Sequence, residues 1–335
     1  MGGILGKRCT PLPDSLKGVY DMSLTAKRWS RYIIAIVIIF SLNFVIPRAM
    51  PGDPLTNLLG EDVVLTDSSV TKLRSEMGLD RSFSQQYLDY WRGILHLNLG
   101  YSFHLHSPVS EIIYSRMKWT LLLALPSLLM GGVLGTYLGT LAGWRSRSNS
   151  QKMQTAFFLT LYCTPPYFLC LLALYLLSFK LALFPLKGFY ATGSAADIAH
   201  HLFLPIMVMT LFSLSRNYMI MRGSVLSEKS SLYAAYARAK GLYDDEILFR
   251  HVFKNSLLPI ITLLAMDFGF ILSGALFVEI VFSMNGMGNL IYDALLSRDY
   301  PVLQGSFLII TLMVVSANLL ADLLYSRLDP RVRWQ

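Results

Sequence analysis

Long apolar runs constrain the fold of this chain more than any other feature. A bilayer core of about 30 Å is crossed by roughly 20 consecutive apolar residues in a helix. Only 15% of the residues are charged and the mean hydropathy is +0.48, far more apolar than a water-soluble domain of this size requires. The sequence therefore predicts an all-α fold, a polytopic membrane helical bundle of about six transmembrane helices. The apolar runs are residues 121–142, 156–179, 202–221, 257–282 and 306–324, with a shorter one at 33–46.

The distribution of positive charge predicts how these helices are oriented. The formal net charge is +8, and 19 of the 29 Lys and Arg residues fall in segments 1–31, 144–153, 216–256 and 326–335. Cytoplasmic loops carry an excess of Lys and Arg, above all where the loops are short. We therefore expect both termini on the cytoplasmic side, and we attribute the basic charge to membrane topology rather than to binding of nucleic acid.

These predicted spans divide the chain into five parts. They are a loose cytoplasmic tail (1–31), a first transmembrane helix (32–47), an extracytoplasmic loop (48–118), a core with five transmembrane helices (119–325) and a cytoplasmic C-terminal tail (326–335). Apolar residues at helical spacing predict two short amphipathic helices in the loop, at 67–77 behind Thr66 as N-cap and at 85–96. We expect both helices to lie against the outer membrane face or the outer mouth of the bundle.

Glycine and proline predict how the core helices are shaped. Gly131, Gly135 and Gly139 recur at a spacing of four residues, and small residues allow helices to approach closely in lipid. Pro165 and Pro166 should kink the third apolar run, because each removes a backbone donor. A bent helix that lines a translocation path and a purely structural bend both fit this pattern.

The segment 222–256 is the only sizeable internal cytoplasmic loop that this topology allows. Its residues 231–241 read Ser-Leu-Tyr-Ala-Ala-Tyr-Ala-Arg-Ala-Lys-Gly, which predicts a short alanine-rich helix ended by Gly241. Arg238 and Lys240 place positive charge near the C-terminus of that helix, where it is favourable. The small residues suit insertion into a groove of a partner protein, and a surface helix lying on the inner leaflet is the other interpretation.

The chain carries none of the common enzyme motifs. The phosphate-binding pattern Gly-x-x-x-x-Gly-Lys-Ser/Thr is absent, and so are His-Glu-x-x-His and Gly-x-Ser-x-Gly. We therefore expect no catalytic residue and no cofactor in this chain. Any ATP hydrolysis would belong to another subunit.

Two acidic residues lie within the fifth apolar run. Ionisable groups at membrane depth are costly and mark functional sites by default. Asp267 is a candidate for lining a translocation path, where it would face an amine or a cation. Glu279 is a second candidate, or else a structural partner of a basic group near the interface.

Five of the six histidines, His96 among them, fall in predicted extracytoplasmic segments, and the other four of these lie in two close pairs. Imidazole suits nickel, copper and zinc, so these side chains are candidates for a metal site. No carboxylate or cysteine completes such a site in the sequence, and we interpret the histidines as solvated or interfacial. The four paired histidines considered as metal ligands are His104, His106, His200 and His201.

A series of short motifs resembles the ABC importer permeases of the dipeptide, oligopeptide and nickel branch. Ala237-Arg238-Ala239-Lys240-Gly241-Leu242, Arg250-His251, Asn255 and Leu258-Pro259 are similar to the cytoplasmic coupling loop of these permeases. The likeness extends over nearly the whole chain after the tail. The other motifs are Pro51-Gly52-Asp53-Pro54, Gly78-Leu79-Asp80, Gln86-Tyr87, Leu99-Gly100-Tyr101-Ser102-Phe103, Pro108-Val109, Thr164-Pro165-Pro166-Tyr167-Phe168, Glu279, Arg298-Asp299-Tyr300-Pro301, Asn318-Leu319, Asp322 and Asp329-Pro330-Arg331-Val332-Arg333.

The chain departs from the permease pattern at two places. Asn285 precedes Gly286-Met287-Gly288 where proline is usual, and Tyr236 stands where alanine or threonine is more usual. The first departure bears on the conformation of the outer loop. The second is consistent with adjustment to a particular ATPase.

The resemblance implies a type I ABC importer permease fold in the bacterial inner membrane. It also implies a homologous second permease subunit, two cytoplasmic ATPase subunits that bind ATP and Mg²⁺, and an extracytoplasmic substrate-binding protein. Coupling to the ATPases would fall on Ala235, Ala237, Arg238, Lys240 and Gly241. Short peptides are the expected cargo, import of nickel or a metal chelate by the same machine is the alternative, and a stand-alone secondary transporter or channel is the third possibility.

Overall fold

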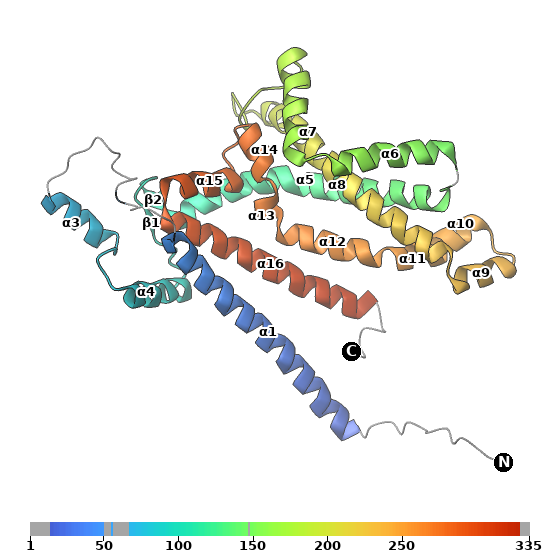
Figure 1. The fold of residues 1–335 in the computed structure, drawn as a ribbon, viewed down its shortest axis with the longest axis horizontal. Helices are drawn as coiled ribbons and strands as arrows, with labels where there is room; N and C mark the ends of the chain where they lie inside the picture. Colours follow the sequence, from blue (N-terminus) through green and yellow to red (C-terminus); the bar gives the residue numbers. More distant parts are fainter. Residues whose placement is uncertain (1–13, 50–54, 56–66, 147, 329–335) are drawn as a thin grey trace.

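The structure is a computed structural model that describes residues 14–49, 55, 67–146 and 148–328. The described residues are almost entirely helical, apart from one antiparallel pair of two-residue strands (Figure 1). In chain order the elements are α1 (Asp14–Ala49), α3 (Asp67–Glu76), α4 (Phe83–Leu95), β1 (Tyr101–Ser102), β2 (Ser107–Pro108), α5 (Val109–Trp144), α6 (Asn149–Cys163), α7 (Pro166–Ala173), the π-helix η1 (Leu174–Lys180), α8 (Ala195–Lys229), α9 (Leu232–Ala239), α10 (Asp244–Ile247), the π-helix η2 (Leu248–Val252), α11 (Phe253–Ser256), α12 (Leu258–Gly269), α13 (Ile271–Gly274), α14 (Leu276–Val281), α15 (Met287–Ser297) and α16 (Tyr300–Leu328).

Three described helices are long and apolar enough to cross a membrane. They are α5, α8 and the part of α16 at Tyr300–Leu320. Two bent helix pairs raise the number of spans to five if each pair crosses once, and the apolar part of α1 at Ile33–Ala49 is shorter than these. The predicted all-α polytopic membrane fold is confirmed.

The third apolar run is bent where the two prolines stand. Helix α6 ends at Cys163 and α7 begins at Pro166, with an angle of 101° between the two helical parts. Pro166 occupies the first turn of α7, where its missing N–H would have no partner in the helix anyway. The predicted kink is therefore confirmed. The fifth run is not one helix as its length suggests, because it breaks after Gly269 and Gly274 into α12, α13 and α14.

Helix α1 begins earlier than the sequence indicates. We expected a loose tail up to residue 31, but the helix begins at Asp14 and is continuous to Ala49. Its first half contains two Lys, two Arg and two Leu residues, which favour the helix over a coil. The remainder of the tail, residues 1–13, lies outside the described residues.

The two predicted loop helices exist and α4 packs on α1. Helix α4 begins with a capping box in which Ser82 and Gln85 exchange hydrogen bonds. Phe44 of α1 contacts the rings of Tyr87 and Tyr90 edge-on or tilted, with centroids 5.2 and 5.4 Å apart. Helix α3 ends before Gly78, which has a φ of +67°. Thr66, its expected N-cap, lies outside the described residues.

The glycine stripe of α5 packs against α8. A Cβ at Gly135 would lie 2.7 Å from the Cβ of Asn217, and a Cβ at Gly139 would lie 2.7 Å from the carbonyl oxygen of Tyr218. Both distances are shorter than any ordinary van der Waals contact, so the two backbones can approach this closely only because the residues are glycine. This contact holds α5 and α8 together, and both the cavity and the helix α9 described below adjoin this pair.

Candidate functional site

Helix α9 is a short exposed helix with a well-defined end. The N–H of Gly241 donates to the carbonyl of Arg238 at 2.9 Å, and the N–H of Leu242 donates to the carbonyl of Ala237 at 3.3 Å. This pair of bonds is a Schellman motif, which needs a left-handed residue after the last helical turn. Gly241 provides it with a φ of +84°. The helix and its glycine stop, both predicted from the sequence, are confirmed.

One face of α9 is buried against the core and the other is exposed. Ala234 and Ala237 are buried in an apolar cluster that contains Met221 and Val225 of α8. Ala237 therefore packs α9 against the core, and its part in coupling to the ATPases stays a prediction.

The outward face of α9 is exposed and partly apolar. Leu232 is 90% exposed and Tyr236 is 65% exposed, which is unusual for side chains of this size. Ala235, Arg238 and Lys240 are exposed as well. Leu232, Ala235 and Tyr236 thus present a partly apolar surface on the outward face of α9.

Trp144, at the end of α5, holds α9 in place. Lys229 of α8 donates a hydrogen bond to the Trp144 carbonyl, and its ammonium lies 4.7 Å from the centroid of the Trp144 ring. The guanidinium of Arg238 lies 5.4 Å from the same centroid. These cation–π contacts join α9 to the α5–α8 pair.

Asp267 forms an ion pair with Arg216 beside a cavity between α5, α7, α8 and α12. The Arg216 guanidinium on α8 donates to the Asp267 carboxylate on α12. Both residues line a cavity of about 430 Å³, together with Pro166, Cys170 and Phe212. Of the two prolines, only Pro166 faces this cavity. Pro165 is the N-cap of α7.

Arg216 is a functional candidate that our reading of the sequence did not single out. The sequence does contain a signal for it, because Arg216 is a charged residue shortly before the end of an apolar run. Its pairing with Asp267 could not be predicted, because the two residues are 51 positions apart.

Glu279 is fully buried and takes part in a different set of contacts from Asp267. Its carboxylate accepts hydrogen bonds from Thr120 Oγ1 at 2.5 Å and from the N–H of Asn289 at 3.0 Å. It does not line the Asp267 cavity. The partners of Glu279 are thus a hydroxyl and backbone groups, and the basic partner that we considered is not among these hydrogen bonds.

Gly286 and Gly288 make room for that carboxylate. A Cβ at Gly286 would lie 2.6 Å from Oε2 of Glu279, and a Cβ at Gly288 would lie 2.6 Å from Cα of Leu276. The Gly-x-Gly motif therefore serves to bring the start of α15 onto Glu279. Asn285, at the departure from the permease pattern, accepts a hydrogen bond from Arg116 through its carbonyl oxygen.

The four histidines do not converge on a common point. His200 and His201 each have a ring nitrogen within hydrogen-bond distance of a backbone carbonyl, of Leu183 and Asp197 respectively. His104 and His106 are exposed near the β1–β2 turn. Among the residues that the structure describes, no group of three or more His, Cys, Asp or Glu side chains could hold a metal ion.

These features together define a class of protein. Helices long and apolar enough to cross a membrane carry an ion pair beside a cavity, and a basic helix is exposed at one end of the bundle, as expected of a multi-pass membrane transport subunit. Residues 135–334 match the model of the binding-protein-dependent transport system inner membrane component, and residues 22–124 match the N-terminal model of the membrane component of such systems. The chain belongs to this family of ABC transporter permeases.

Curated relatives cover most of the chain. A putative peptide permease protein of Brucella ovis is 33% identical over 87% of this chain and 93% of that protein. A probable peptide ABC transporter permease protein of Sinorhizobium fredii is 30% identical over 90% of this chain and 96% of its own length. The dipeptide transport system permease protein of Escherichia coli is 31% identical over 87% of this chain and 93% of that protein.

Proposed function

We propose that this chain is a permease subunit of an ATP-driven importer of short peptides. It forms the translocation path together with a homologous second permease. Two cytoplasmic ATPase subunits dock on the coupling loops of the two permeases, one of them on α9 of this chain, and an extracytoplasmic binding protein delivers the peptide. The exposed face of α9, with Leu232 and Tyr236 outward, carries the docking assignment. The printed names of the relatives, which are peptide and dipeptide permeases, support the choice of cargo.

The cavity beside Arg216 and Asp267 is the part of the path that this subunit contributes. A short peptide carries a terminal ammonium and a terminal carboxylate, and an Arg–Asp pair offers a partner for each. Closure of the ATPases would move α9, Trp144 would pass the motion to α5 and α8, and the cavity would open alternately to the two sides. The N-terminus and the C-terminus both lie on the cytoplasmic side in this arrangement, in agreement with the distribution of Lys and Arg.

Transport into proteoliposomes tests the proposed function. The full complex and its binding protein are reconstituted, and ATP-dependent uptake is measured for labelled dialanine, for a labelled oligopeptide, and for nickel, free and chelated. We expect peptide uptake that requires ATP and the binding protein. Uptake of nickel without uptake of peptide would support an ATP-driven importer but contradict the peptide cargo. Peptide uptake by the permeases in the absence of the ATPase subunits would contradict the proposal of an ATP-driven importer.

A matched pair of variants tests the docking face. Tyr236→Ala removes the exposed ring on α9, and Tyr292→Ala removes another exposed tyrosine, on α15, at the opposite end of the bundle (Figure 1). We expect Tyr236→Ala to reduce the amount of ATPase that co-purifies with the permease and Tyr292→Ala to leave it unchanged. Equal retention in the two variants would contradict docking at α9.

A further inference from the structure

The cavity beside Arg216 and Asp267 has a largely apolar wall. Its volume of about 430 Å³ is in the range of small-molecule sites, which is about 300–1,000 Å³. The larger apolar side chains in its lining come from α5, α8, the end of α12 and α14, and we call them the apolar wall. They are Leu128, Val208, Met209, Phe212, Phe270 and Phe277. Phe270 and Phe277 are 50% and 55% exposed, so both rings keep surface that a ligand can contact.

The polar side chains of the same lining are already engaged. Ser127 donates to the carbonyl of Leu123 at 2.8 Å, and the Ser213 hydroxyl oxygen accepts from the side-chain amide of Asn217 at 3.3 Å. Arg216 and Asp267 pair with each other. The termini that this pair would receive are common to all short peptides, so the pair does not distinguish one peptide from another. The side chain of the peptide is what the apolar wall would meet.

An apolar wall treats apolar and charged side chains differently. An aliphatic or aromatic side chain gains free energy when it leaves water for apolar surroundings. A lysine or glutamate side chain would lose hydration there, and its only counter-charge among the described lining residues would be one member of the ion pair. The cavity therefore suits the first class of side chain and disfavours the second.

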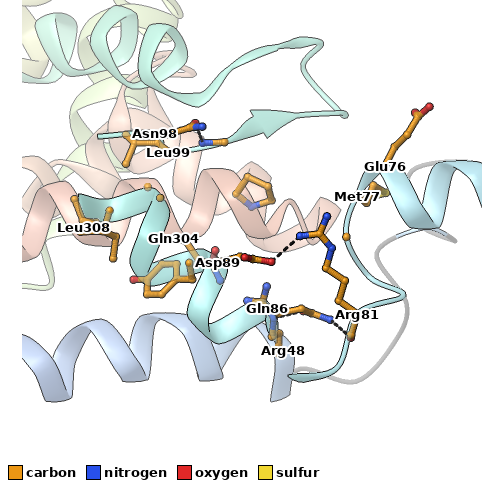
Figure 2. A pocket seen from close by; sticks show the side chains of 17 residues that line it. Arg48, Glu76, Met77, Arg81, Gln86, Asp89, Asn98, Leu99, Gln304 and Leu308 are labelled. Carbon is orange, nitrogen blue, oxygen red and sulfur yellow. Dashed lines mark hydrogen bonds and ion pairs between the residues drawn. The ribbon is translucent and has the colours of Figure 1, made fainter. Parts of the chain in front are cut away.

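The other large cavity of the bundle differs in kind. It has a volume of about 470 Å³ and lies between the end of α1, the α3–α4 turn, α4 and the start of α16. Figure 2 shows the charged side chains around it, among them Glu76 and the pair of Arg81 with Asp89, which are 2.6 Å apart. An apolar wall is thus a particular property of the cavity between α5, α7, α8 and α12.

We propose that the apolar wall selects peptides by their side chains during translocation and favours aliphatic and aromatic side chains over charged ones. The inference rests on the peptide importer function above and names the class of short peptide that this subunit transports most readily. Selection here follows capture by the binding protein and is independent of it. Phe270 and Phe277 are the specificity-determining residues, because their rings are exposed beside the ion pair.

Competition between two peptides in proteoliposomes tests this selection. The full complex and a fixed amount of its binding protein are given ATP and an equimolar mixture of labelled alanyl-phenylalanine and labelled dialanine. The measured quantity is the ratio of the two initial uptake rates, at equal amounts of assembled complex. The binding protein has its own preference, but it is the same in every sample. A change of the ratio in a permease variant therefore reports the permease.

Removal of one ring gives the residue-level test. Phe270→Ala and Phe277→Ala should each lower the ratio of alanyl-phenylalanine to dialanine uptake about three- to tenfold. A difference of one methylene in an enclosed apolar pocket discriminates about 10- to 200-fold, and these two rings are only half enclosed. Phe268→Ala is the matched control. Phe268 lies on α12 two positions away and is 40% exposed, but it does not line the cavity, so the ratio should be unchanged.

A carboxylate in the apolar wall should shift the selection. Phe270→Glu would attract a lysine side chain and repel a glutamate side chain. We expect uptake of alanyl-lysine relative to alanyl-glutamate to rise about three- to tenfold in this variant. Phe268→Glu adds the same charge outside the cavity lining and should leave that ratio as it is in the unaltered complex.

The outcomes separate this inference from the proposed function. If Phe270→Ala and Phe277→Ala keep the ratio of the unaltered complex, or if Phe268→Ala lowers it equally, selection at the apolar wall is wrong. Uptake of dialanine that requires ATP and the binding protein would then still establish the importer. If the unaltered complex takes up neither peptide, the proposed function is wrong and the inference that depends on it falls too.

Discussion

Thr120 and Glu279 are joined by a buried hydrogen bond of 2.5 Å, although 159 positions separate them in the chain. The same threonine hydroxyl oxygen accepts a hydrogen bond from the N–H of Met287 at 2.7 Å, at the first residue of α15. Three elements, α5, α14 and α15, therefore meet at one polar point inside apolar surroundings. Buried polar groups that are fully paired in this way fix one arrangement of the elements around them.

Substitution of Gly286 tests this junction. In Gly286→Ala the new methyl group collides with the Glu279 carboxylate, and overpacking of a buried site costs about 1–3 kcal/mol. We expect a lower melting temperature of the purified permease. The cost should shrink when Glu279→Ala is combined with Gly286→Ala, because the smaller side chain leaves room for the methyl group.

Gly223→Ala is the control for that experiment. Gly223 lies in α8, and a Cβ there meets nothing within 4 Å. Alanine favours a helix over glycine by up to about 1 kcal/mol, so the melting temperature should be unchanged or higher. Equal losses in Gly223→Ala and Gly286→Ala would show that the Glu279 carboxylate does not set the cost.

Gly241 should tolerate substitution according to backbone conformation and not according to side-chain size. A Cβ at this position meets nothing within 4 Å, but its φ of +84° lies in the left-handed region. Asparagine adopts that region more readily than other side chains, whereas valine is strongly disfavoured there. We expect Gly241→Asn to retain most ATP-dependent peptide uptake and Gly241→Val to lose it while the chain still inserts in the membrane. Similar uptake by both variants would contradict a conformational role.

Local features were predictable from the sequence. The glycine end of α9, the bend at Pro165-Pro166 and the approximate bounds of α4 follow from residues that act within a few positions of themselves. The close contact along Gly135 and Gly139 was also predictable, because small residues four positions apart in an apolar helix are typical of a close helix–helix contact in lipid.

Long-range pairing was not predictable. Glu279 and Asp267 look alike in the sequence, as acidic residues in one apolar run, yet one pairs with backbone groups and Thr120 and the other with Arg216. The difference arises from which elements pack against α12 and α14.

Asp299 should make stability depend on pH. It precedes α16, where it accepts from the N–H of Val302 at 3.3 Å and from the hydroxyl of Ser102, and burial raises its pKa above the ordinary value. An acid with a raised pKa in the folded state contributes stability that is complete below the unfolded pKa of about 3.9 and is lost as pH rises through the folded pKa.

The substitution Asp299→Asn checks this dependence. An amide keeps an acceptor for the Val302 N–H and does not ionise, so the fall in stability above pH 3.9 should become shallower than in the unaltered permease. The measurement is the free energy of unfolding of the two proteins across that pH range. A steeper fall in Asp299→Asn would show that the carboxylate, and not the protonated acid, stabilises the fold.

Substitutions of Arg216 and Asp267 can distinguish a structural role of this ion pair from a role in transport. Asp267→Leu leaves the guanidinium of Arg216 without its partner, and loss of a buried partner costs about 3–5 kcal/mol. Because the Arg216 and Asp267 side chains remain 27% and 16% exposed, we expect a smaller loss of about 2 kcal/mol. The double variant Arg216→Met with Asp267→Leu removes both charges and should regain most of that stability. If the pair only holds α8 to α12, this stable double variant will transport peptide normally. If the pair receives the charged ends of the peptide, it will fold, bind the ATPases and hydrolyse ATP, yet fail to accumulate dialanine in proteoliposomes, which is the result we expect.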